Sequence, residues 1–261
     1  MAKKIKVVTQ NCFLSIRTAK VVRLMQQTKA DVFCLQEITR QKVAERIKKY
    51  TGLPYIISGR IRAFLHIRFH NAIFTKLPIR QQGELTFTKP LNTDNHFTGK
   101  ALWITVKYQQ RLIRIYNCYL NINRCGMKDR KDALLGIIKH SNNFEGPIII
   151  CGDMNTAISQ KNYQRRLAKL IQRVPYPTFE EVGQYAYKSE KYLFYDTLQK
   201  SGFREVCDIE KNTWGFPLPF IRPAIFNLKL DWFLVKNFSD YSYRFGPFIG
   251  DHKSIITELT T

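Results

Sequence analysis

Short apolar runs rich in β-branched residues recur from one end of the chain to the other, and they restrict its fold more than any other feature. Polar residues bound each run, and none approaches the ~18 consecutive apolar residues that a membrane-spanning helix requires. Such runs are typical of buried strands. The predicted strands are Ile5–Cys12, Asp31–Gln36, Tyr55–Ile57, Asn71–Phe74, Ala101–Val106, Leu112–Leu120, Pro147–Cys151, Leu228–Val235 and Ser254–Leu259. The chain is therefore expected to form sheets and to contain no transmembrane segment.

Segments with helical spacing and good helix formers lie between these runs. The predicted helices are Thr18–Gln27, Gln41–Tyr50, Lys128–His140, Tyr163–Gln172 and Tyr192–Ser201. The order begins strand–helix–strand–helix and later changes to hairpins, such as Ala101–Val106 joined to Leu112–Leu120 by Lys107–Arg111. Hairpins impose antiparallel pairing, so mixed sheets are expected. We predict an α/β (α+β) fold over residues 1–261, a single domain forming a four-layer α/β/β/α sandwich with two sheets face to face and helices outside.

The chain is strongly basic, because 42 Lys and Arg residues stand against 20 Asp and Glu residues and give a formal net charge of +22. Hydrophobic residues make up 44% of the sequence, which disfavours a disordered polybasic chain. The basic residues are scattered instead of forming a tail, as expected of a charged face on a folded body. This excess favours a polyanionic partner such as nucleic acid, with a merely soluble basic surface as the alternative.

The cysteines and the amino-terminal residues bear on location. No two of the six cysteines have C-x-x-C spacing, and Cys12, Cys34, Cys118 and Cys151 lie in apolar runs. Buried thiols in a reducing compartment are expected, and a structural zinc site is not. Polar residues follow Met1–Lys6 too soon for a cleavable signal peptide. We therefore expect a cytoplasmic protein, and a monomer, with non-classical secretion left open.

Because acidic residues are scarce, polar clusters at strand ends attract attention. Gln10–Asn11 ends the first predicted strand, and Glu37 follows the second. By itself such a glutamate is more often a solvated strand end. Asp153 and Asn155 follow a very apolar strand through Gly152, whose freedom permits a turn. An ordinary Asx turn is the alternative explanation there.

Two further clusters lie near the carboxyl end. Asp231 stands among large apolar residues, where a buried carboxylate is costly without a partner, so a cation or an imidazole is expected beside it. Asp251 and His252 are adjacent, just before the last predicted strand. They offer a metal ligand or an orienting acid next to a group that can be protonated near neutral pH.

The order of these clusters resembles the endonuclease/exonuclease/phosphatase superfamily, which includes pancreatic-type deoxyribonucleases, abasic-site endonucleases, neutral sphingomyelinases and inositol polyphosphate 5-phosphatases. The resemblance covers nearly the whole chain and rests on Asn11, Gln36–Glu37, Gly152–Asn155, Leu230–Trp232 and Asp251–His252. Asn71–Ile79 resembles the family's hairpin segment, and Lys100–Trp103 and Thr213–Trp214 are similar to family residues.

The chain departs from the family pattern at two places. Tyr119 stands where many members have histidine, similar to the tyrosine of abasic-site endonucleases, and Gly250 replaces the serine of the last motif. The first departure leaves the substrate class open. The second retains both chemical groups of the motif, the Asp251 carboxylate and the His252 imidazole.

The resemblance implies a divalent-metal-dependent phosphodiesterase. Glu37, with Asn11 and Asp251, would hold the cation, and oxygen ligands select Mg²⁺, with Mn²⁺ as a substitute. Asp153 would orient and deprotonate the attacking water, and Asn155 would donate a hydrogen bond to the phosphate or the nucleophile.

The resemblance also assigns groups that stabilise charge on the phosphate. His252, held by Asp231, would donate to a non-bridging oxygen, and Tyr119 would supply a further donor.

The charge favours a nuclease acting on DNA or RNA. Trp214 and Arg222, in an aromatic stretch that predicts an ordered surface loop over Asn212–Asn227, are candidate substrate-binding residues, as is Lys76. A satellite hydrophobic cluster is the alternative for those aromatics. A phosphoinositide, inositol phosphate or sphingomyelin substrate remains the alternative for the activity. A degenerate member that binds phosphates without cleaving them is the third, although such a binder gains nothing from acidic groups facing phosphate.

Overall fold

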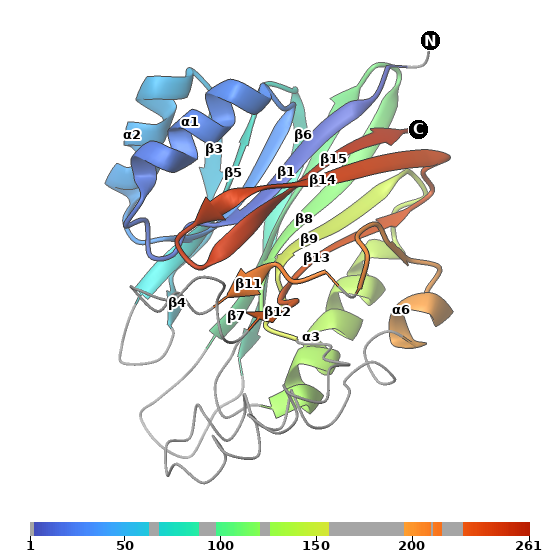
Figure 1. The fold of residues 1–261 in the computed structure, drawn as a ribbon. Coiled ribbons are helices and arrows are strands. Elements are labelled where there is room, and N and C mark those ends of the chain that lie inside the picture. Colours follow the sequence, from blue (N-terminus) through green and yellow to red (C-terminus); the bar gives the residue numbers. More distant parts are fainter. Residues whose placement is uncertain are drawn as a thin grey trace, which may run out of the picture.

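Two mixed β-sheets form the centre of the molecule in the computed structural model, which describes residues 3–62, 68–88, 98–120, 126–156, 196–209, 211–215 and 227–261 (Figure 1). The first sheet has, in spatial order, β12 (Asn227–Leu228), β11 (Trp214–Gly215), β15 (His252–Thr260), β1 (Ile5–Asn11), β2 (Val32–Ile38), β5 (Arg68–Thr75) and β3 (Tyr55–Ile57), with β14 (Asp240–Ile249) on β15 and β4 (Ile61–Arg62) on β5.

The second sheet has the order β10 (Arg204–Glu205), β13 (Asp231–Lys236), β9 (Ile148–Asp153), β8 (Arg111–Tyr119), β7 (Thr98–Tyr108) and β6 (Ile79–Thr88). Each sheet contains one parallel pair among the described strands, β1 with β2 and β8 with β9, and the other pairs are antiparallel. The predicted mixed sheets are thus confirmed, as is the hairpin of β7 and β8.

Helices cover the outer face of each sheet. Apolar residues of α1 (Thr18–Thr28) and α2 (Gln41–Thr51) pack against the first sheet, and those of α3 (Gly126–Ser141) and α6 (Asp196–Lys200) against the second. The helices lie on opposite sides of the molecule in Figure 1. The four-layer α/β/β/α sandwich is therefore confirmed. None of the helices in the described ranges is long and apolar enough to cross a membrane.

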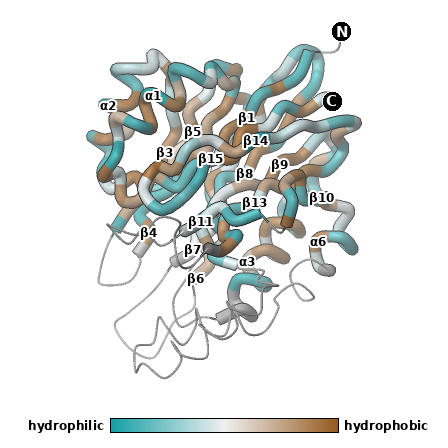
Figure 2. The backbone as a smooth tube through the Cα atoms, in the orientation of Figure 1, coloured by the Kyte–Doolittle hydropathy of each residue, from teal (hydrophilic) through white to brown (hydrophobic). Residues whose placement is uncertain are grey.

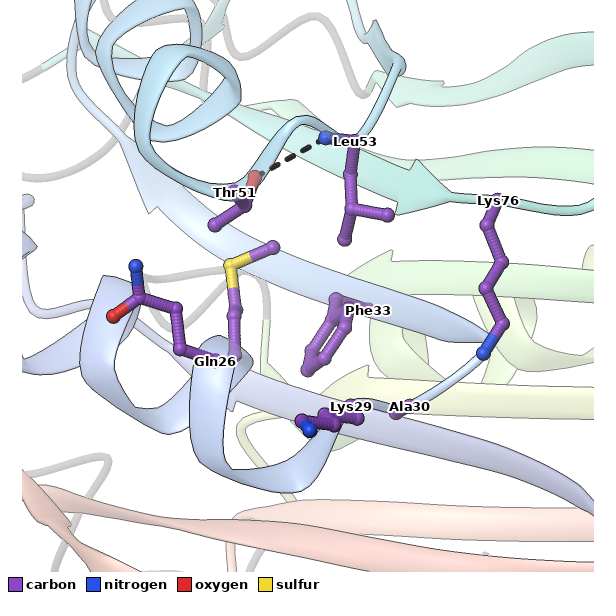
Figure 3. Close-up of a pocket in the computed structure, with 8 residues that line it drawn as sticks. Gln26, Lys29, Ala30, Phe33, Thr51, Leu53 and Lys76 are labelled. Atoms are coloured by element: carbon purple, nitrogen blue, oxygen red, sulfur yellow. Dashed lines mark hydrogen bonds between the residues drawn. The ribbon is translucent and has the colours of Figure 1, made fainter.

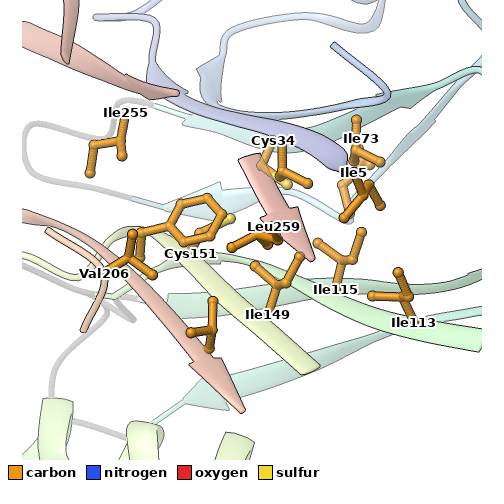
Figure 4. Packing of buried hydrophobic residues seen from close by; sticks show 14 of the residues in the cluster. Ile5, Cys34, Ile73, Ile113, Ile115, Ile149, Cys151, Val206, Ile255 and Leu259 are labelled. Atoms are coloured by element: carbon orange, nitrogen blue, oxygen red, sulfur yellow. The ribbon is translucent and has the colours of Figure 1, made fainter. Parts of the chain in front are cut away.

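The main core lies between the sheets and follows strand alternation. In β2, Val32 and Cys34 face the second sheet, whereas Phe33 and Leu35 face the helices. Figure 2 shows brown, hydrophobic stretches in the central strands between white and teal positions. Cys34 of β2 meets Ile149 and Cys151 of β9 among the residues of Figure 4. Burial of each such side chain contributes about 1.5–3 kcal/mol to the stability of the fold. Packing in this layer therefore determines how one sheet lies on the other.

Several sequence predictions were wrong in detail. The segment 71–79 is no hairpin, because β5 pairs with β2, β3 and β4 whereas β6 pairs with β7, so the chain crosses between the sheets there. Strands β6 and β14 were not predicted, because both alternate with many polar residues. The predicted strand Leu228–Val235 is divided into β12 and β13.

Other predictions fall partly or wholly outside the described residues. The predicted helix Tyr163–Gln172 lies outside them, and α6 is the described part of Tyr192–Ser201. The predicted loop Asn212–Asn227 begins with a short strand, β11, and residues 216–226 lie outside the described ranges. All five cysteines in the described ranges are buried and free, as expected.

Candidate active site

The polar clusters meet at one end of the sandwich, where β1, β2, β8 and β9 end. Asp153 lies opposite Asp231 in the pairing of β9 with β13, and opposite Tyr119 in the pairing of β9 with β8. Asp153 also continues the alternation that directs Ile149 and Cys151 into the space between the sheets. The termini Ile5 and Thr260 of β1 and β15 lie at the other end, near the marks N and C in Figure 1. The apolar core between the sheets thus ends at a cluster of polar side chains.

Asp153 is held by a backbone that only glycine permits. Gly152 has φ +131°, and a Cβ there would lie 2.1 Å from the Cys118 carbonyl oxygen. The Asp153 Oδ1 accepts from the Asn155 N–H at 2.9 Å, which is the geometry of an Asx turn. Its Oδ2 accepts from the Asn11 amide at 2.8 Å. The Asx turn therefore uses the Oδ1 of Asp153, whereas the Oδ2 contacts the other polar side chains of the cluster.

Glu37 points into the same cluster because β2 is irregular. The pairing of β2 with β5 shifts register between Leu35 and Ile38, and Glu37 has φ +59°. A bulge of this kind redirects a side chain, and a non-glycine residue in that region costs about 1–3 kcal/mol. The Glu37 Oε1 accepts from Asn11 at 3.1 Å and its Oε2 from the Leu14 N–H at 2.9 Å. Glu37 is thus held in the cluster by hydrogen bonds and is not a solvated residue at a strand end.

His252 of the first sheet lies beside two acids of the second sheet. Its Nδ1 lies 2.8 Å from the Asp231 Oδ2, which confirms the imidazole expected beside Asp231. Its Nε2 lies 3.9 Å from the Asp153 Oδ2. Gly250, with φ +75°, precedes this pair, and a Cβ there would lie 2.4 Å from that of Phe13. Glycine is therefore required where most relatives were expected to have serine.

Trp214 orients Asp251. The indole N–H of Trp214 donates to the Asp251 Oδ2 at 2.8 Å, and β11 pairs with β15 where Trp214 lies opposite His252. The Asp251 Oδ1 is buried and accepts no hydrogen bond among the described residues. A buried carboxylate oxygen without a donor is suited to a cation.

Comparison with known proteins identifies the family of the chain. A model of the Endonuclease/Exonuclease/phosphatase family matches residues 8–252. The chain belongs to this family. Members of the family are metal-dependent phosphoric ester hydrolases. No curated protein matches the sequence.

Solved structures share the fold at low identity. Truncated Caenorhabditis elegans TDP2 has a TM-score of 0.65 at 12% identity, over 99% of this chain and 98% of that one. An endonuclease/exonuclease/phosphatase family protein from Leptotrichia buccalis has 0.65 at 16%, over 98% and 100%. D. rerio TDP2, complexed with a single strand DNA product, has 0.64 at 11%, over 99% of each chain. These likenesses show the fold.

Several side chains of this cluster have strongly shifted pKa values. Burial raises the pKa of Glu37, and it raises the pKa of Asp153 to about 8 although His252 acts in the opposite direction. Burial by itself lowers the pKa of His252, but the carboxylates of Asp231, Asp153 and Asp251 outweigh it and raise the value to about 10. His252 is thus a cationic donor at neutral pH. Burial, with Glu37 and Asp153 nearby, raises the pKa of the Tyr119 hydroxyl.

The donor set fits a hard divalent cation of the kind that family members use. Among the described residues no three His, Cys, Asp or Glu side chains are grouped to hold a metal by themselves. Mg²⁺, however, retains several waters and needs only one or two carboxylates. Glu37 and the Asp251 Oδ1, which lies 3.8 Å from the His252 Nε2 and accepts no hydrogen bond among the described residues, could provide these. Asn11 differs from expectation, because its amide N–H groups face the two acids while its oxygen accepts from the Phe13 N–H at 2.9 Å.

One predicted substrate-binding residue, Lys76, is not brought to this site. The Lys76 ammonium pairs with the Asp31 Oδ1 at 2.9 Å, and Asp31 precedes β2 whereas Glu37 lies near its end. Figure 3 shows Lys76 beside Phe33 and Leu53, at a pocket that α1 and α2 border. Lys76 therefore lies at the opposite end of β2 from the cluster. Arg222 lies outside the described residues.

A buried amide network beneath the site was missed. The Gln36 amide donates to the Asn117 Oδ1 at 2.6 Å, and Asn117 donates to the carbonyls of Leu35 and Ala72, each at 2.9 Å. Asn71 donates to the Asn117 carbonyl at 3.2 Å. All three amide residues are fully buried. Amides inside apolar strands are costly unless paired, which is the signal that predicts such a network. They tie the first sheet to the second directly below Glu37.

Proposed function

We propose that the protein is a divalent-metal-dependent phosphodiesterase that cleaves nucleic acid, DNA or RNA. The single observation that carries this proposal is the double hydrogen bond from the Asn11 amide, to Glu37 at 3.1 Å and to Asp153 at 2.8 Å. It holds the candidate metal ligand of one sheet beside the candidate base of the other. Hydrolysis of a phosphate ester requires both groups at the same phosphorus.

In the proposed mechanism Asp153 orients the attacking water and accepts its proton. The raised pKa of Asp153 suits a general base that works near neutral pH. Glu37 and Asp251 would hold Mg²⁺, whose charge would offset the charge on the phosphate oxygens, while Asn11 holds Glu37 through its amide N–H. Because Glu37 and Asp153 share Asn11, displacement of either acid disturbs the other.

The remaining polar groups stabilise charge on the phosphate. His252, kept protonated by Asp231, donates from Nε2 to a non-bridging oxygen. Asn155 donates one amide hydrogen to the Leu120 carbonyl at 2.7 Å, and its side chain also interacts with the Tyr119 hydroxyl, so the two residues would donate to the phosphate side by side. Tyr119, whose raised pKa keeps it protonated, is the further donor.

A nucleic-acid substrate is supported by the net charge of +22 and is consistent with the D. rerio TDP2 relative, which is complexed with single strand DNA. Phosphoinositides, inositol phosphates and sphingomyelin are the alternative substrates, since basic surfaces also serve anionic lipids. Retention of all the carboxylates disfavours a phosphate-binding member without activity. Free buried cysteines support, in addition, the proposed location in the cytoplasm.

Metal-dependent turnover tests this proposal. Purified protein is assayed with Mg²⁺, with Mn²⁺ and with chelator on plasmid, single-stranded DNA, RNA, abasic duplex, inositol phosphates and sphingomyelin. We expect cleavage of at least one nucleic acid, lost in chelator. Glu37→Gln removes a carboxylate charge, so it raises the Mg²⁺ requirement and lowers turnover, whereas the exposed Glu45→Gln does neither. Full wild-type activity in chelator contradicts the metal role.

A further inference from the structure

A basic cavity adjoins the proposed active site and takes no part in the mechanism above. Its volume is about 560 Å³, and the described residues that line it include Arg40, Arg60, Arg68 and His70 but no carboxylate. The three arginines are exposed, and none of them makes an ion pair with another described residue. Unpaired guanidinium groups around one hollow repel one another, so the cavity is suited to an anion.

The cavity lies close to Glu37. Arg40 follows Glu37 by three residues, so their Cα atoms are at most about 11 Å apart. His70 lies opposite Ile38 in the pairing of β2 with β5. On the far side Ser58 accepts from the Asn71 N–H at 2.9 Å, and Asn71 belongs to the buried amide network beneath the site. The cavity wall and the active site are thus supported by the same buried amides.

The arginine side chains that line the cavity favour phosphate over other anions. Guanidinium groups present paired N–H donors that match phosphate oxygens better than a lysine does. The first turn of α2 borders the cavity through Gln41, has no acidic residue, and receives no side-chain cap from Arg40. The positive end of the α2 dipole adds to the potential that the arginines create.

The position of the cavity indicates which phosphate of the substrate it would bind. The cavity is close enough to Glu37 to contact the strand that the active site would cleave, because the Arg40 and Glu37 Cα atoms are at most about 11 Å apart. We propose, on the basis of the proposed function, that this cavity binds a backbone phosphate of the nucleic acid that neighbours the phosphate that is cleaved. Substrates with a single phosphodiester would leave it empty. The cavity therefore makes oligonucleotides the preferred substrate class.

A matched pair of double variants tests the cavity. Arg60→Gln with Arg68→Gln removes two charges from it, and Lys48→Gln with Lys49→Gln removes two exposed charges from the far end of α2. Each pair is introduced beside Asp153→Asn, and binding to a labelled 12-nucleotide single strand is measured by anisotropy at four salt concentrations. We expect the cavity variant to lose about tenfold or more in affinity and its slope of log K against log salt to flatten by about 0.7–1.4, one or two phosphate contacts. The control variant should lose less than threefold.

Equal losses and equal slopes in the two variants overturn the proposal. Active protein provides a second measurement, in which the cavity variant should raise KM for the oligonucleotide far more than it lowers kcat. The proposed function is tested separately by wild-type hydrolysis of bis(4-nitrophenyl) phosphate, which has one diester and no neighbouring phosphate. Absence of that hydrolysis contradicts the proposed chemistry, while the anisotropy data still decide whether the cavity binds a strand.

Discussion

Asn11 carries more of the proposed chemistry than an amide at a strand end normally does. Its two N–H groups join carboxylates from different sheets, and its oxygen orients the Phe13 N–H. Two acids this close repel each other when both are ionised, which is one reason why the pKa of Asp153 is raised. The amide partly offsets that repulsion, so the pair remains suited to a cation.

Asp153 and His252 should act as a unit. Their polar atoms lie 3.9 Å apart, and each holds the other's ionisation state. Asp153→Asn and His252→Gln should each lower kcat on the order of 10²–10⁴-fold, and the double variant should lose less than the product of the two. Steady-state rates on the best substrate measure this. Near-wild-type rates in either single variant refute the proposed roles.

Sequence alone predicted which residues carry charge at the site better than it predicted where side chains point. Asp231 in an apolar strand required a partner, and His252 is that partner. Lys76 was assigned to the substrate because its segment resembles the family, yet residue order does not show which end of a strand faces the site. The indole N–H of Trp214 is occupied by Asp251, a contact that requires the pairing of β11 with β15.

At the level of elements, most strands followed from their apolar runs, whereas their irregularities did not. The run ending at Gln36 predicted β2, but the bulge that turns Glu37 inward depends on how β5 pairs with it. Strand β14 was missed because polar residues alternate with Tyr241, Tyr243 and Phe245, which pack on the core. Pairing partners far along the chain decide both features, and local patterns contain no information about them.

Gly152 in β9 offers a stability test with an internal control. Gly152→Ala places a Cβ against the Cys118 backbone at φ +131°, so it should destabilise the fold by more than about 4 kcal/mol or prevent folding. Gly52→Ala, at φ +71° with open space around the new Cβ, should cost about 1–2 kcal/mol. Urea unfolding of both variants gives the comparison. Equal, small losses would show that β8 and β9 adjust to the added methyl group.

The buried pair of Lys229 and Glu205 joins β10 to the start of β13. Their charged atoms lie 3.2 Å apart, and Lys229 is fully buried. Burial raises the pKa of Glu205, against the opposite effect of Lys229. Lys229→Met removes the counter-charge and should destabilise the fold by about 3–5 kcal/mol at neutral pH, since an unpaired buried carboxylate remains.

The pH dependence of that loss has a definite sign. In Lys229→Met the pKa of Glu205 in the folded state lies above its unfolded value. The contribution of Glu205 to stability is therefore greatest below the unfolded pKa of about 4.3, and it falls as pH rises through the folded pKa. The deficit relative to wild type should therefore shrink on acidification. Unfolding in urea at several pH values measures it, and Lys229→Met with Glu205→Gln should recover much of the loss. A deficit that does not change with pH would exclude an ionised Glu205 as its cause.

For the whole molecule, the net charge of +22 has a consequence that no single residue reveals. A protein that lays Lys and Arg along duplex DNA releases condensed counterions, so log K falls with log salt at a slope near −0.9 for each phosphate contact. With charge spread over the body, about four to eight contacts are expected, and affinity should fall by about two to four decades between ~50 and ~200 mM salt. Phosphates carry no sequence information, so the loss should be similar for unrelated duplexes.

Anisotropy of a short duplex with Asp153→Asn protein at four salt concentrations measures this slope. A small phosphorylated headgroup cannot displace that many ions, so the slope separates the nuclease from its alternatives. Inositol phosphates should compete only weakly against the duplex at ~50 mM salt. A slope of about one or less would remove nucleic acid as the preferred substrate and favour the phosphoinositide or lipid alternative. The same protein, with its site unchanged, would then hydrolyse phosphate esters of small headgroups.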